Sequence, residues 1–142
     1  MNTKVLLAAL AGGVVAFLLG WLIWGILLMD YFNSMCTPEG LALQRAPEEM
    51  IMWGMIASNL VYGLLLALIY SRWANISSFR GGAIAGAVIC GLVALSLDLG
   101  WYSYLKMWTS PTMLIVDPLV NAVFGAVVGG VVGWVLGYGD KK

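Results

Sequence analysis

The chain has 142 residues, of which 62% are hydrophobic and only 10% are charged, and its formal net charge is zero. A soluble domain carries about 25% charged residues, so this composition excludes an ordinary soluble fold. The balanced charge offers no basic surface to nucleic acid. The chain has no histidine, which removes bis-histidine haem and the usual imidazole zinc sites, and we expect neither a metal nor a cofactor.

Four apolar runs match a bilayer core, which is about 30 Å thick and takes roughly 20 helical residues. We predict membrane spans at residues 5–29, 50–70, 81–104 and 112–138, which use most of a single integral membrane domain, 1–142. The first run is too long for the apolar region of a signal peptide, so we predict an uncleaved span, with a cleaved leader as the alternative. The predicted fold is an all-α membrane protein, a four-transmembrane-helix bundle of antiparallel neighbours.

The longest connection, residues 30–49, is acidic and contains two prolines. Within it we expect a short interfacial helix over residues 37–44. Thr37 is suited to cap the helix, Pro38 fits the first helical position, and Glu39 suits the positive end of the helix dipole.

Basic side chains set the expected orientation. One end of the bundle would carry Lys4, Arg72, Arg80, Lys141 and Lys142, and the other only Arg45 and Lys106. Because positive charge is enriched in cytoplasmic loops, we expect both termini in the cytoplasm of a bacterial inner membrane and the acidic loop on the outer side.

The two halves of the chain show weak internal similarity. Asn59-Leu-Val-Tyr-Gly63 in span two matches Asn121-Ala-Val-Phe-Gly125 in span four. Gly20-Trp-x-x-Trp24 matches Gly100-Trp-x-x-Tyr104 in the same way. The pattern indicates two pseudo-repeated helical hairpins in the same orientation, and chance similarity is the alternative.

Small residues recur at every fourth position in the last two spans. In lipid, such spacing lets helix backbones approach closely, and dispersion contacts then hold the helices together. We therefore predict a role in helix packing for the glycines of these stripes, which are Gly82, Gly86, Gly125, Gly129, Gly133 and Gly137.

Each glycine stripe ends in an acid. Asp98 continues the stripe of span three and would point into the bundle, where an intramembrane carboxylate can bind a proton or cation. The alternative is a structural acid near the interface, hydrogen-bonded to Tyr, Ser or Lys106. Asp117 has the same two interpretations, and the following Pro118 favours a helix that starts there, with residues 112–116 along the interface.

Two amides lie at a depth comparable to that of the acids. Asn59 and Asn121 are each about nine residues from the outer ends of their spans. Hydrogen bonds between helices are the simpler explanation for both. The alternative explanation is a polar pocket that opens outward beneath Trp24, Trp53 and Trp101 and is lined by the two amides and the two acids.

A family resemblance rests on a few short segments. Leu99-Gly-Trp-Tyr-Ser103, the acidic loop after a Gly/Trp-bearing first span, and Leu114-Ile-Val-Asp117 resemble a family of uncharacterised small four-span bacterial membrane proteins. That family carries a Gly-x-x-Trp-Tyr-Ser-Pro motif. Here tryptophan follows glycine directly, Tyr104 stands in the place of proline, and the signature lies on span three rather than span one. The resemblance implies a four-span fold and no particular activity.

Two functions remain as hypotheses. The first is the binding or translocation of a small solute or ion through the outward-facing pocket. The second is a non-catalytic accessory subunit whose glycine ridge docks a second copy or another membrane protein. We expect no enzyme, because histidine and a nucleophile paired with a base are both absent. The expected partners are the lipid bilayer and a copy of the chain or a membrane protein, with no nucleic acid, and Cys36 would be a free thiol.

Overall fold

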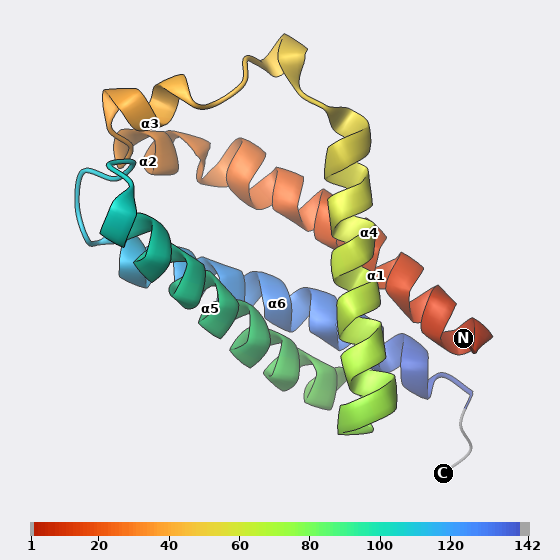
Figure 1. Ribbon diagram of the computed structural model, residues 1–142. Helices are drawn as coiled ribbons and strands as arrows, with labels where there is room; N and C mark the ends of the chain where they lie inside the picture. The colour runs from red at the N-terminus through yellow and green to blue at the C-terminus, as the bar shows by residue number, and fades with distance from the viewer. Residues whose placement is uncertain (1, 140–142) are drawn as a thin grey trace.

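The computed structural model describes residues 2–139, which fold almost entirely into helices (Figure 1). α1 and α4 each continue into a π-helical turn, and a separate 3-10 turn lies in the long connection. In chain order the elements are α1 (Thr3–Leu22), η1 (Ile23–Leu27), α2 (Met29–Ser34), α3 (Pro38–Ala42), η2 (Pro47–Glu49), α4 (Met52–Ile69), η3 (Tyr70–Ala74), α5 (Phe79–Tyr104) and α6 (Met113–Gly137).

Four helices are long and apolar enough to cross a membrane: Thr3–Leu27, Met52–Ala74, Phe79–Tyr104 and Met113–Gly137. Each contains between 23 and 26 residues, more than the roughly 20 that a bilayer core requires. This confirms the predicted all-α fold with four membrane-spanning helices, and the chain is a small membrane protein. The second span runs past its predicted end at residue 70 because the π-helical turn η3 continues it through the polar Ser71 and Arg72.

The four helices form two hairpins that meet along one line of contact. α5 packs most extensively on α6, α1 packs on α4, and the hairpins join chiefly where α1 meets α6. α4 and α5 are joined by only a short turn, yet they meet sparsely and diverge in Figure 1. The prediction that helices adjacent in sequence pack as antiparallel neighbours is therefore wrong for α4 and α5.

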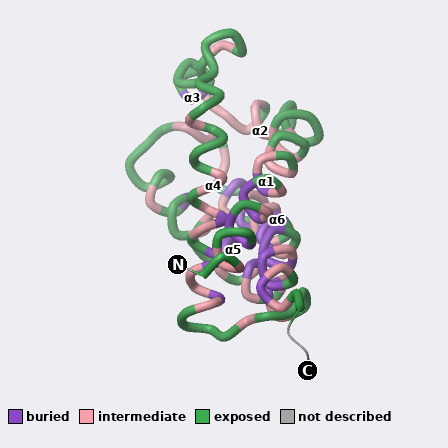
Figure 2. The backbone as a smooth tube through the Cα atoms, turned by 90° about the vertical axis from the view of Figure 1, so that its right-hand side faces the viewer, coloured by how far each residue is buried: buried purple, intermediate pink, exposed green. Residues whose placement is uncertain are grey.

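The bundle has two distinct ends. We call the end that carries residues 2–5, 70–82 and 133–139 the terminal end, and the end with the long loop 30–49 the loop end. The buried residues of Figure 2 concentrate along α1 and α6, whereas α3 at the loop end is largely exposed.

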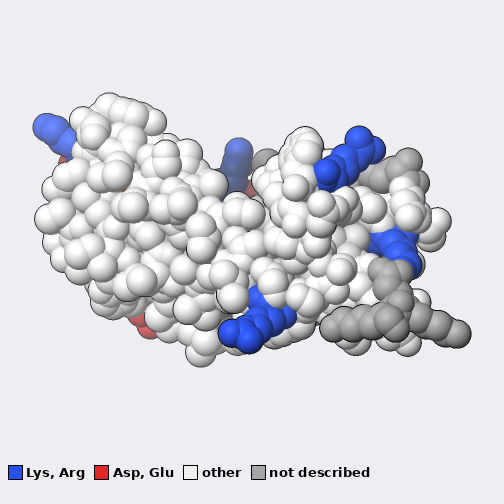
Figure 3. Space-filling model, turned by 90° about the horizontal axis from the view of Figure 1, so that it is seen from below, with Lys and Arg blue, Asp and Glu red and all other residues white. Residues whose placement is uncertain are grey.

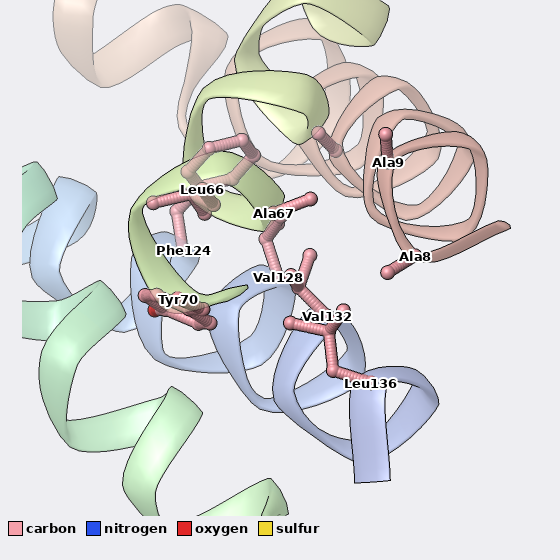
Figure 4. Packing of buried hydrophobic residues seen from close by; sticks show 10 residues of the cluster. Ala8, Ala9, Leu66, Ala67, Tyr70, Phe124, Val128, Val132 and Leu136 are labelled. Carbon is pink, nitrogen blue, oxygen red and sulfur yellow. The ribbon is translucent and has the colours of Figure 1, made fainter. Parts of the chain in front are cut away.

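The apolar core lies where α1, α4 and α6 meet, towards the terminal end. Figure 4 shows Leu66 and Tyr70 of α4 and η3 against Val128 and Val132 of α6, with Ala8 of α1 beside them. All five side chains are fully buried. The Tyr70 hydroxyl donates a 2.7 Å hydrogen bond to the carbonyl of Gly82, which ties η3 to the start of α5.

The stripes of α5 and α6 face each other along one seam, which we define by the pairs Gly82–Gly133, Gly86–Gly129, Cys90–Gly125 and Asp98–Asp117. A Cβ atom added to Gly82 would lie 3.1 Å from the Gly133 Cα, and one added to Gly86 would lie 3.0 Å from the Gly129 Cα. The same added atoms would also collide with the backbone carbonyl oxygens of Gly129 and Gly125, so neither position has room for a side chain. The glycines therefore let the two backbones touch, and the same fourfold spacing carries the contact on to the acids.

Gly137 extends this close packing beyond the seam, because a Cβ there would lie 2.9 Å from the backbone carbonyl carbon of Ser77. The turn before α5 is thereby held against the end of α6. Ser78 then caps α5 by accepting a 3.2 Å hydrogen bond from the Gly81 N–H.

α6 begins at Met113, and Pro118 lies inside the helix and is buried. The interpretation that the last span starts at Asp117 is therefore wrong. An internal proline removes one backbone hydrogen bond, but membrane helices tolerate this where neighbouring groups compensate.

The loop end contains the predicted interfacial helix. α3 begins at Pro38, and the Thr37 hydroxyl accepts a 3.0 Å hydrogen bond from the Gly40 N–H, which confirms the predicted cap. The same hydroxyl donates a 2.6 Å hydrogen bond to the Lys106 carbonyl. Backbone hydrogen bonds from Thr37 to Met107 and from Thr109 to Met35, both 2.9 Å, join the two connections at this end.

Most of the surface is apolar. The face in Figure 3 is largely uncharged, with only isolated Lys, Arg, Asp and Glu side chains. Large apolar side chains are exposed along every spanning helix, as expected for surfaces that contact lipid.

Candidate functional site

Asp98 of α5 and Asp117 of α6 meet near the loop end of the seam. Their carboxyl groups lie within hydrogen-bonding reach of each other. Asp98 is only 5% exposed, and its Oδ2 atom has no hydrogen-bond partner among the described residues. A buried carboxyl oxygen without a partner is costly in a membrane, so this position stands out as a site that a ligand would satisfy.

Asp117 has two further partners. The Asn121 amide donates to its Oδ2 atom at 2.8 Å and to its backbone carbonyl at 3.0 Å. The Trp24 side chain also forms a hydrogen bond with the carboxyl group. Trp24 lies in the π-helical turn η1, and such turns in otherwise α-helical segments are frequent at functional sites. Asp117 is therefore fixed in place, whereas Asp98 retains one unpaired oxygen.

Two cavities adjoin at this acidic pair. The first, of about 480 Å³, lies between α4, α5 and α6, and the second, of about 520 Å³, lies beneath loop 30–49. Four residues line both of them: Trp24, Asp98, Trp101 and Asp117. A group bound at the carboxyls could therefore be reached from either cavity.

The first cavity is aromatic and apolar apart from the acids and amides. The Phe124 ring lies 5.3 Å from the Trp24 ring and 5.8 Å from the Tyr62 ring, measured between centroids. No lysine or arginine of the described part of the chain lines this cavity. The half-exposed side chains of Leu65 on α4 and of Val93 and Leu97 on α5 line it on the outer surface, where these two helices meet sparsely.

The second cavity is also lined mainly by apolar side chains, but Asn33, Gln44 and the exposed Arg45 of the connecting segments add polar groups to its wall. It lies on the loop-end side of the carboxyl pair and forms a vestibule to the pair.

Comparison with models of known protein families, with curated proteins and with solved structures finds no match. The resemblance to the four-span family therefore stays a prediction.

The two asparagines line the first cavity, but they do not bridge helices. The Asn59 amide donates a 2.8 Å hydrogen bond to the Met55 carbonyl in its own helix, four residues earlier. Asn121 bonds Asp117 in the same manner. The interpretation of both amides as bonds between helices is therefore wrong, because each reaches a carbonyl on the preceding turn of its own helix.

Two cavity residues were missed by the sequence analysis. The Tyr62 hydroxyl contacts the Cys90 thiol across the first cavity, and Phe124 packs beside them. The sequence does contain a signal for Tyr62 and Phe124. Each follows an asparagine of the repeated segments by three residues and therefore lies on the same helix face as that asparagine.

The remaining predicted residues lie outside the acidic pair. Trp53 is 76% exposed and lines neither of the two cavities. Cys36 is a free, half-buried thiol at the edge of the vestibule, and burial raises the pKa of this thiol above its ordinary value. Within the part of the chain that the structure describes, no group of three or more Cys, Asp or Glu side chains could hold a metal.

Proposed function

We propose that this chain is a small protein of the bacterial inner membrane that binds a proton or small cation at Asp98 and Asp117 and translocates it. The observation that carries this proposal is the Oδ2 atom of Asp98, which is buried without a hydrogen-bond partner among the described residues. Asp98 is only 5% exposed and lies where two cavities adjoin. An aspartate costs about 2.5–3.5 kcal/mol at a membrane-helix centre and less towards the helix end, where Asp98 lies, and an ionisable residue inside a span is by default a functional-site hypothesis.

The chemistry of the pair supports proton exchange. An ionised carboxylate is only an acceptor, so two carboxyl groups can share a hydrogen bond only when one of them carries a proton. The pair would then hold one proton and one negative charge. A cation that enters the site can replace that proton and leave the total charge unchanged.

The positive charges support cytoplasmic termini. Lys4, Arg72 and Arg80 belong to the terminal end, whereas Arg45 and Lys106 belong to the loop end. Lys141 and Lys142, which would strengthen this bias, lie outside the described residues. The vestibule beneath loop 30–49 would then face the outer side, and the glycine-packed part of the seam would close the cytoplasmic side.

The accessory-subunit alternative is less favoured because its docking surface is already used. Gly82, Gly86, Gly129 and Gly133 are buried against each other between α5 and α6 of the same chain. A partner would have to bind some other face. We also propose that the role is non-catalytic, because the cavities lack the nucleophile–base arrangement that an enzyme of this kind would need.

Proton flux tests the proposal. The purified chain is reconstituted into vesicles that contain a pH-sensitive dye, and a potassium diffusion potential drives proton entry. We expect Asp98→Asn to reduce the flux to the level of protein-free vesicles. Asp30→Asn, which removes an exposed carboxylate of α2 that lines neither cavity, should leave the flux unchanged. Equal flux in the Asp98→Asn and unaltered proteins would contradict the proposal.

A further inference from the structure

We propose that the cation is a lipophilic organic cation, one with a bulky apolar body around its charge, and that it enters the first cavity from the bilayer between α4 and α5. This inference rests on the proposed function, since it names the ligand of the same acidic pair. Three features of the first cavity support it: its charge, its lining and its opening.

The charge of the cavity selects a cation. Asp98 and Asp117 both line the cavity, the Oδ2 atom of Asp98 is buried without a hydrogen-bond partner, and no lysine or arginine among residues 2–139 lines the space. A ligand that brings a positive charge would satisfy this oxygen. An anion would meet like charge without any basic partner, which costs far more than it gains in a site withdrawn from water.

The lining selects an organic cation over a metal ion. Four aromatic side chains line the cavity together with the two acids: Trp24, Tyr62, Trp101 and Phe124. Ring faces attract organic cations such as quaternary ammonium groups, and the attraction strengthens when the cation is desolvated. An inorganic ion would require more oxygen ligands, whereas a cavity of about 480 Å³ with few polar atoms is of the size and kind that holds a small organic molecule.

The opening favours entry from lipid. Leu65 of α4 and Val93 and Leu97 of α5 line the cavity, yet they are 46%, 54% and 49% exposed. These apolar side chains therefore border an entrance on the membrane-facing side, where α4 and α5 meet sparsely. The vestibule instead is lined by Arg45, which repels a cation, so the two approaches to the carboxyls differ in charge.

Binding should release a proton. The pair shares one proton in the empty site, and an organic cation at the same place would neutralise the same charge. One proton would then leave through the vestibule to water, and the net charge of the site would not change. Apart from the two acids, the titratable and charged groups that line the two cavities are Tyr62 of α4, Cys90 of α5, and Cys36 and Arg45 of the connecting segment.

The first experiment measures binding to the full chain in lipid nanodiscs. The probe is methyltriphenylphosphonium, and triphenylphosphine oxide is the uncharged control with the same three rings. Titration calorimetry should show saturable binding of the cation only, with release of one proton in buffers of different ionisation enthalpy. Asp98→Asn should weaken the affinity by at least about tenfold, as expected for the loss of a charged partner, while Asp30→Asn should not.

The second experiment tests the entrance. Val93→Trp fills the opening between α4 and α5, whereas Val88→Trp alters the same helix at a side chain that is equally 54% exposed but lies outside the cavity. Val93→Trp should slow the association of the probe, and Val88→Trp should not. Equal association rates in the two variants would overturn entry between α4 and α5.

The results separate this inference from the proposed function. If Asp98→Asn abolishes proton flux but neither the unaltered protein nor its variants bind the phosphonium, the ligand class is wrong and the proton site remains. If the neutral phosphine oxide binds as well as the cation, the charge argument is wrong. If Asp98→Asn changes neither flux nor phosphonium affinity while the protein stays monodisperse, both proposals fail.

Discussion

The two ends of the α5–α6 pair are built from the same sequence spacing but behave in opposite ways. Towards the terminal end the seam consists of Gly82, Gly86, Gly129 and Gly133, and the backbones are in contact. Towards the loop end the same spacing brings Asp98 against Asp117, and cavities open on either side of them.

The comparison shows how a small membrane protein can hold a polar site. Membrane helices gain nothing from apolar burial against each other, so close backbone packing must supply the association. The glycines provide that packing at one end, and the rigid pair of helices then fixes the two acids at the other. The cost of the buried carboxyls is offset by contacts made elsewhere along the seam.

The largest effect is expected from a substitution that disrupts the glycine packing at the terminal end. A Cβ on Gly129 would collide with the Gly82 carbonyl and lie 2.9 Å from the Gly86 Cα, both backbone atoms. We expect Gly129→Leu to destabilise the fold by about 3 kcal/mol or more, because the two helices must separate. Thermal unfolding in detergent, followed by circular dichroism, would measure the loss.

Gly100 provides the matched control. It lies in α5 near the loop end, and a Cβ there would meet nothing nearer than the Tyr104 ring at 3.8 Å. Gly100→Leu should therefore unfold at the temperature of the unaltered protein. If Gly129→Leu left the monomer intact and only dissociated an oligomer, the glycine ridge would serve a partner rather than α5.

A smaller effect is expected from the loss of a single buried hydrogen bond at the terminal end. Tyr70 is fully buried, and its hydroxyl bonds the Gly82 carbonyl at 2.7 Å. Tyr70→Phe removes this bond without changing the packing of the ring, so we expect a loss of about 1 kcal/mol. Tyr104→Phe, at a side chain 70% exposed, should be neutral in the same unfolding experiment. Equal stability of the two variants would show that the bond does not hold η3 to α5.

Hydropathy and spacing predicted much of this fold. The four spans, the Thr37 cap and the fourfold stripes were all visible in the sequence because each depends on local features of one segment. The stripes also carried information about the site. A stripe that places glycines at one end and an acid at the other, on both helices of an antiparallel pair, brings the acids together when the glycines meet.

The predictions that the structure contradicts concern features that depend on the packing of neighbouring helices or on the lipid environment. Hydropathy cannot tell which spans pack, since every lipid-facing side is equally apolar, and so the separation of α4 from α5 was not predicted. Asn59 could reach a partner helix or its own preceding turn, and only the packing decides. The Asp-Pro pair at residues 117–118 suggests a helix start by the rules of water-soluble helices, but in α6 proline is tolerated inside the span.

The smallest predicted effect lies at the loop end and should remain local. The Thr37 hydroxyl caps α3 through Gly40 and also bonds the Lys106 carbonyl, so it joins the two connections above the vestibule. Thr37→Ala should lower the stability of this end by about 1 kcal/mol, and most of the loss should appear as local opening, because no spanning helix depends on this cap.

Cleavage within loop 30–49 by a protease should become faster while the unfolding temperature of the bundle barely changes. Thr37→Ser keeps the hydroxyl and should cleave at the original rate. If Thr37→Ala instead lowered the unfolding temperature as much as Tyr70→Phe, the two ends of the molecule would unfold as one unit, and the contrast between a rigid glycine-packed end and a separately ordered vestibule would not hold.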